Sequence, residues 1–136
     1  MDFTFTPEQE ALRDTVRRFA ETELAPLARE ADDTELFPKH LFRRFGELGL
    51  IGVRYPAEDG GAGFDKVSDC ILREEMSRVC QAFSSSLSGH SHLGIWPIWK
   101  AGTDQQKQRF FIPGLAGEKI AGFALSEPDG GSDIRA

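Results

Sequence analysis

The sequence has few cysteines, no excess of basic residues and no long hydrophobic run. Its two cysteines, Cys70 and Cys80, lie ten residues apart without a CxxC pattern, so we expect free thiols in a reducing compartment. The net charge of -6 argues against a nucleic-acid-binding protein, which needs a basic face. No apolar run approaches the ~20 residues that span a bilayer, and the first residues lack the basic and apolar regions of a signal peptide. These absences predict a cytoplasmic protein without a membrane span.

What is present is the pattern of one helical domain. Apolar residues make up 40% of the 136 residues, enough for a modest core. A first helix is predicted from Pro7, because Thr6 can cap it and Gln9 completes a capping box. Pro26 should kink or interrupt this helix near its end. The apolar stripe of the helix comprises Leu12, Val16, Phe19, Ala20 and Leu24.

Further helices follow the first. Phe37-Pro38 should open a helix that Gly49 ends, with an apolar face of Leu41, Phe42, Phe45 and Leu48. The next helix covers roughly residues 65–80, with Val67, Cys70, Ile71 and Val79 facing inward and Arg73, Glu74, Glu75 and Arg78 forming a charged outer face. The stretch from Ser84 to Gly94 is also predicted to be helical, and a capping box from Thr103 to Gln106 opens a helix to about Pro113. The helical domain therefore covers residues 1–118.

The last stretch has a different pattern and should begin a second domain at residues 119–136. Ile120 to Leu125 is a short apolar run that suits a buried strand. It ends in Ser126 and in Glu127-Pro128, where proline stops ladder hydrogen bonding. Gly130-Gly131 can bring bare backbone against a ligand. A strand that leads into a glycine-rich polar loop is suited to hold a flat, phosphate-bearing cofactor.

The segment Phe-Ala-Leu-Ser-Glu-Pro-Asp-Gly-Gly-Ser-Asp, residues 123–133, resembles the flavin-binding signature of the acyl-CoA dehydrogenase family. Residues 48–61 and 101–107 also resemble this family's sequences, in the same order. The resemblance implies the family's orthogonal N-terminal helical bundle, followed by the first strand of a β-barrel-like middle domain. Because the chain ends three residues past the signature, we expect a fragment of a longer protein or a natural truncation.

The resemblance also implies a function for the intact protein, namely FAD-dependent α,β-dehydrogenation of an acyl-CoA to a trans-2-enoyl-CoA. Phe123, Leu125 and Ser126 would line the flavin ring, with Gly131 and Ser132 on its phosphate side. Ser132 would also meet the substrate. An electron-transfer flavoprotein is the expected electron acceptor, and the intact protein is expected to be a homo-oligomer.

The resemblance implies that the catalytic base lies outside these 136 residues, so no catalytic residue is assigned. Residues 1–136 alone are expected to show no acyl-CoA dehydrogenase activity. Glu127 is not taken as the base, because a carboxylate before proline more readily bonds backbone or pairs with an arginine. His90 and His92 face different directions on a helix, which favours structural or pocket-lining roles over a metal site. By resemblance, Ser88 to Leu93 borders the acyl pocket.

Three readings of the function remain open at this point. The first is the acyl-CoA dehydrogenase itself. The second is a flavin monooxygenase or nitroalkane oxidase on the same scaffold, although such proteins often lose parts of the loop that is intact here. The third is a non-catalytic helical partner subunit.

Overall fold

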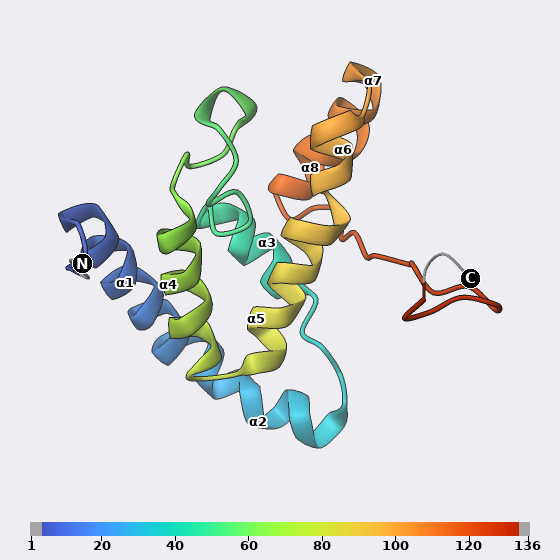
Figure 1. Cartoon of the computed structure of the whole chain (residues 1–136). Coiled ribbons are helices and arrows are strands. Elements are labelled where there is room, and N and C mark those ends of the chain that lie inside the picture. The colour runs from blue at the N-terminus through green and yellow to red at the C-terminus, as the bar shows by residue number, and fades with distance from the viewer. Residues whose placement is uncertain (1–3, 134–136) are drawn as a thin grey trace.

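The computed structural model describes residues 4–133, and its regular structure is helical (Figure 1). The α-helices are α1 (Pro7–Phe19), α2 (Ala25–Thr34), α3 (His40–Glu47), α4 (Lys66–Ser77), α5 (Gln81–Ser88), α6 (Trp96–Ala101), α7 (Asp104–Gln106) and α8 (Ile112–Leu115). Wider π-helical turns lie at Ala20–Leu24, Gly89–Gly94 and Lys107–Phe111, and a 3-10 turn lies at Ala57–Asp59. In Figure 1, α4 lies between α1 and α5, while α6, α7 and α8 gather at the other end of the molecule.

The start of α1 confirms the predicted capping box. The Thr6 hydroxyl accepts from the Gln9 backbone N–H at 3.2 Å, and the Gln9 side chain accepts from the Thr6 N–H at 3.0 Å. The expected interruption near Pro26 is also present, because the α-helix gives way to the π-helical turn Ala20–Leu24 and resumes as α2. Since Pro26 has no N–H and its ring crowds the preceding turn, a widened turn lets the helix continue past it.

α3 begins at His40, three residues later than Phe37, where the sequence suggested it would start. Its end agrees with the prediction, because Gly49 has a φ of +71° just beyond the helix. The predicted apolar face is confirmed, with Leu41, Phe42 and Phe45 buried. Aromatic edge-to-face contacts tie this face to α1 and to the π-helical turn after α5. The core consists of Val16, Phe19, Ala20, Leu24, Leu41, Phe42, Phe45, Leu50, Ile51, Val53, Tyr55, Leu72, Met76, Phe83, Leu87, Ile95 and Phe111.

The face of α4 that was predicted to be buried is partly wrong. Ile71 is buried as expected, but Val67 is 46% exposed and Cys70 is also exposed. Glu75, placed on the outer face, is only 4% exposed. The reason lies in α1, which packs along α4 and supplies Arg17 to bond the Glu75 carboxylate at 2.7 and 2.9 Å.

The strand expected from Ile120 to Leu125 does not form, and residues 4–133 contain no β-strand at all. The only β-type pairing in this range is an isolated bridge between Glu127 and Gly130. A strand needs a neighbouring strand for its ladder, and the described chain offers no such partner. The segment therefore runs away from the helices as an irregular chain, drawn in red in Figure 1.

Candidate functional site

The signature residues lie on this projecting segment and are open to solvent. Phe123 is 54% and Leu125 is 48% exposed, and Ser126, Gly131 and Ser132 are exposed as well. Uncovered apolar side chains next to unshielded hydroxyls suit the ring and the polar edge of a flavin. The residues present therefore fit FAD as one wall of its site.

A tight turn folds the signature back on itself. The Glu127 N–H donates to the Gly130 carbonyl at 2.7 Å, and the Gly130 N–H donates to the Glu127 carbonyl at 3.2 Å. The turn brings Gly131 close to Ser126, because a β-carbon on Gly131 would lie 3.9 Å from the Ser126 hydroxyl oxygen. Ser126, predicted beside the flavin ring, and Gly131, predicted on the phosphate side, are therefore neighbours in space.

His90 anchors the start of the segment to the helices. It is 1% exposed, its Nδ1 accepts from the Ala121 N–H at 3.0 Å, and its Nε2 lies 2.9 Å from the Gly114 carbonyl oxygen. Because Nδ1 is an acceptor, the ring proton resides on Nε2, which donates to Gly114. Burial lowers the pKa of His90 below its ordinary value, so the ring is neutral at pH 7.

Close backbone packing reinforces this anchor. A β-carbon on Gly94 would clash with the Ala121 side chain at 2.6 Å, so the π-helical turn Gly89–Gly94 lies directly against the segment. The sequence suggested only a structural or pocket-lining role for His90. Nothing in the local pattern could show that it joins α8 to residue 121, because these partners are 24 and 31 positions away.

A groove of about 500 Å³ opens where the signature leaves the helices. Its lining residues are Arg54, His92, Leu93, Trp96, Pro97 and Phe123. Of the predicted cofactor contacts, the structure brings Phe123 into this groove together with His92 and Leu93 from the 88–93 segment. Leu125, Ser126, Gly131 and Ser132 do not line it.

The wall behind His92 is polar. The His92 Nε2 lies 3.4 Å from both an Arg73 guanidinium nitrogen and an Asp69 carboxylate oxygen, while Arg73 pairs with Asp69 at 3.2 Å. Burial, together with the Arg73 charge, lowers the pKa of His92. A neutral ring lets Nε2 accept from Arg73, so the three side chains form a connected network. Sequence analysis missed Asp69, and only its spacing of four residues from Arg73 on one helix hints at the pair.

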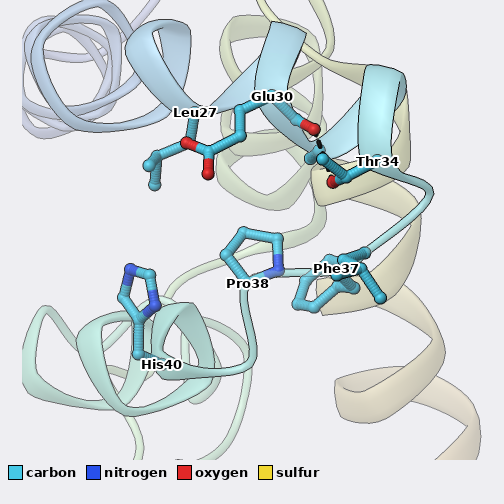
Figure 2. A pocket seen from close by; sticks show the side chains of 8 residues that line it. Leu27, Glu30, Thr34, Phe37, Pro38 and His40 are labelled. Atoms are coloured by element: carbon cyan, nitrogen blue, oxygen red, sulfur yellow. Dashed lines mark hydrogen bonds between the residues drawn. The ribbon is translucent and has the colours of Figure 1, made fainter.

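Other features of the described chain offer less chemistry. Within residues 4–133, no group of three or more His, Cys, Asp or Glu side chains could hold a metal ion, and no helix there is long and apolar enough to span a membrane. A hollow of about 250 Å³ lies between α2 and the chain leading to α3 (Figure 2). Figure 2 shows the Thr34 hydroxyl bonded to the Glu30 carbonyl of its own helix, at 2.6 Å. None of the signature residues 123–133 lines this hollow.

Comparison with known proteins identifies the family. The family model described as acyl-CoA dehydrogenase, N-terminal domain, matches residues 6–118. The short-chain specific acyl-CoA dehydrogenase of Clostridium acetobutylicum is 44% identical over 133 residues, which are 98% of this chain and 35% of that protein. The chain thus spans about a third of the length of the curated relatives it matches.

Two solved structures share the fold. A chain in the structure of the electron transferring flavoprotein of Acidaminococcus fermentans has a TM-score of 0.90 and 36% identity, covering 98% of this chain and 35% of that one. The acyl-CoA dehydrogenase complexed with FAD from Bacillus anthracis has a TM-score of 0.85 and 34% identity, covering 96% of this chain and 23% of that one. The chain described here therefore belongs to the acyl-CoA dehydrogenase family, and its residues 6–118 are that family's N-terminal domain.

Proposed function

We propose that the complete protein is an FAD-dependent acyl-CoA dehydrogenase that converts an acyl-CoA to a trans-2-enoyl-CoA. The observation that carries this proposal is the position of Phe123. It begins the flavin signature and, at the same time, lines the groove with His92, Leu93 and Trp96 from the helical domain. A ligand in the groove would therefore lie against the first predicted flavin contact.

Each signature residue has a proposed part. Phe123 and Leu125 offer apolar contact to the flavin ring, and Ser126 offers a hydroxyl and backbone groups to its polar edge. Gly131 and Ser132 face the phosphate side, and Ser132 also meets the acyl-CoA. When bound, FAD supplies the acceptor for the hydride that leaves the β-carbon. The chain's own residues orient the cofactor and exclude water from one side, and the base that removes the α-proton is proposed to lie outside residues 1–136.

The proposal extends to partners and location. We propose an electron-transfer flavoprotein as the acceptor, supported by the close fold similarity to a chain in a structure of such a protein. A homo-oligomer is proposed from the family resemblance alone. Cys70 and Cys80 are free thiols, which suits a cytoplasmic location.

The test uses the protein expressed with whatever sequence follows Ala136 in its gene. We expect a yellow protein with an FAD spectrum that bleaches when butyryl-CoA is added without oxygen, with crotonyl-CoA as the product. Residues 1–136 alone should give no turnover. A colourless protein that does not take up added FAD would refute the proposal. A hydroxylated product would point to the monooxygenase reading, and oxidation of nitroalkanes but not of acyl-CoA would point to the nitroalkane oxidase.

A further inference from the structure

The groove combines an apolar wall with an unpaired cation. Leu93, Trp96 and Phe123 are all substantially exposed and line one part of it. Arg54 also lines it, and within residues 4–133 its guanidinium has no carboxylate at ion-pair distance and no hydrogen bond. By contrast, Arg17, Arg44, Arg73 and Arg78 are all paired with carboxylates.

The backbone that carries Arg54 is held firmly. Its neighbours Val53 and Tyr55 are buried. The Tyr55 hydroxyl donates to the Ser91 carbonyl at 2.6 Å, and the Ser91 hydroxyl donates to the Ile51 carbonyl at 2.7 Å. These bonds join the link between α3 and α4 to the π-helical turn that carries His92, so Arg54 stays beside the groove.

The local charge is positive although the chain as a whole carries -6. Behind His92, the Asp69 carboxylate is already used by Arg73 at 3.2 Å, which leaves the Arg54 charge uncompensated. The positive charge of Arg54 acts on the His92 ring. Burial and the Arg73 charge lower the pKa of His92, and the Arg54 charge lowers it further. An apolar wall beside a cation strengthens its attraction for an anion, because the groove holds less water than open solvent.

We propose that Arg54 forms an oxyanion subsite of the groove, which binds a carboxylate or phosphate oxygen of the acyl-CoA ligand. This inference rests on the proposed function. A guanidinium offers paired N–H donors that match the two oxygens of a carboxylate or phosphate. Two parts of the ligand supply that chemistry, namely a carboxylate at the far end of a dicarboxylic acyl chain and the phosphates of coenzyme A. Leu93 and Trp96 would contact the methylene groups next to the oxyanion.

The test measures dissociation constants by calorimetry on the complete FAD-loaded protein. Three ligands distinguish the acyl carboxylate from the coenzyme A phosphates as the bound oxyanion, namely S-pentyl-CoA, S-(4-carboxybutyl)-CoA and S-pentyl-pantetheine. All three are thioethers that lack the reactive carbonyl. The variant is Arg54→Gln. The control is Arg29→Gln on α2, whose side chain is 90% exposed and lies outside the groove. Because Arg54 makes no hydrogen bond, the variant should keep the melting temperature of the wild type.

If the oxyanion is the acyl carboxylate, Arg54→Gln should weaken S-(4-carboxybutyl)-CoA about tenfold or more, as expected for a hydrogen bond to a charged group, and leave S-pentyl-CoA unchanged. If it is a phosphate, both CoA ligands should weaken equally while S-pentyl-pantetheine does not change. Wild-type affinity of Arg54→Gln for all three ligands would overturn the inference and leave the proposed function intact. Failure of the wild-type protein to bind either CoA ligand would overturn both.

Discussion

Replacing His90 by leucine should release the signature segment from the helical domain. Leucine fills a similar volume but has no polar atom, so the change removes both hydrogen bonds and keeps most of the packing. The Ala121 N–H then loses its acceptor, while the Gly114 carbonyl keeps the bond that it accepts from the Gly117 N–H at 3.0 Å. An unsatisfied buried polar group costs about 1–3 kcal/mol. Because the Gly114 carbonyl keeps one donor and water can reach the N–H of the partly exposed Ala121, we expect a total loss of about 1–3 kcal/mol in the free energy of unfolding.

The assay combines urea unfolding of the 136-residue chain with amide hydrogen exchange. The Ala121 amide should exchange faster in His90→Leu than the global loss of stability explains, because its acceptor is gone. His40→Leu is the matched control, since His40 is exposed at the start of α3, and it should change stability by less than about 0.5 kcal/mol. The reasoning fails if His90→Leu stays within that range and the Ala121 exchange rate is unchanged.

Three further predictions concern stability and are measured by the same unfolding assay. Glu75→Gln should lower the free energy of unfolding by about 1–3 kcal/mol, a value between those of exposed and buried ion pairs. The control Glu74→Gln, at the exposed neighbouring position, should leave this free energy almost unchanged. Equal losses for the two variants would contradict the contribution of the buried ion pair. Gly117→Ala should cost about 2–4 kcal/mol, because a β-carbon there clashes with the Phe42 carbonyl at a φ of +70°. Gly49→Ala, at a similar φ with nothing near, should cost only the backbone strain of about 1–2 kcal/mol. Finally, stability should fall as the pH drops below 6.5, because the lowered pKa of His90 makes the unfolded state bind protons first. His90 contributes at most about 1.4 kcal/mol per pH unit to the slope of the free energy of unfolding against pH. His90→Leu should therefore make this slope shallower, and an unchanged slope would show that His90 does not contribute to it.

Sequence reasoning succeeded where the determining contacts are local. The capping boxes at Thr6 and Thr103 formed as predicted, because their partners lie three residues away. Gly49 ended α3 for the same kind of reason, since a positive φ is a property of one residue. These features need no knowledge of the tertiary structure.

The sequence failed where a distant segment decides the outcome. Glu75 reads as a solvated residue until α1 is placed beside α4 and Arg17 is found to bond it. Likewise, Val67 and Cys70 are exposed because α1 and α5 take other faces of the same helix. The segment from Ile120 to Leu125 has the apolar content of a strand, but a strand forms only where a neighbouring strand supplies its hydrogen-bond partners. The groove was only partly foreseeable, because Arg54 and Phe123 are far apart in the chain.

The π-helical turn Gly89–Gly94 sets the geometry of the groove through its length as well as its side chains. Deleting one residue from it would allow ordinary α-helical bonding to continue from α5, because the wide turn holds one residue more than an α-helical turn does. The residues on either side of the deletion would then face different neighbours, so His92 and Leu93 would change their positions relative to Arg54, and His90 relative to Gly114. A single-residue deletion here should therefore reshape the groove, which makes the spacing of this turn as important to ligand choice as any one contact.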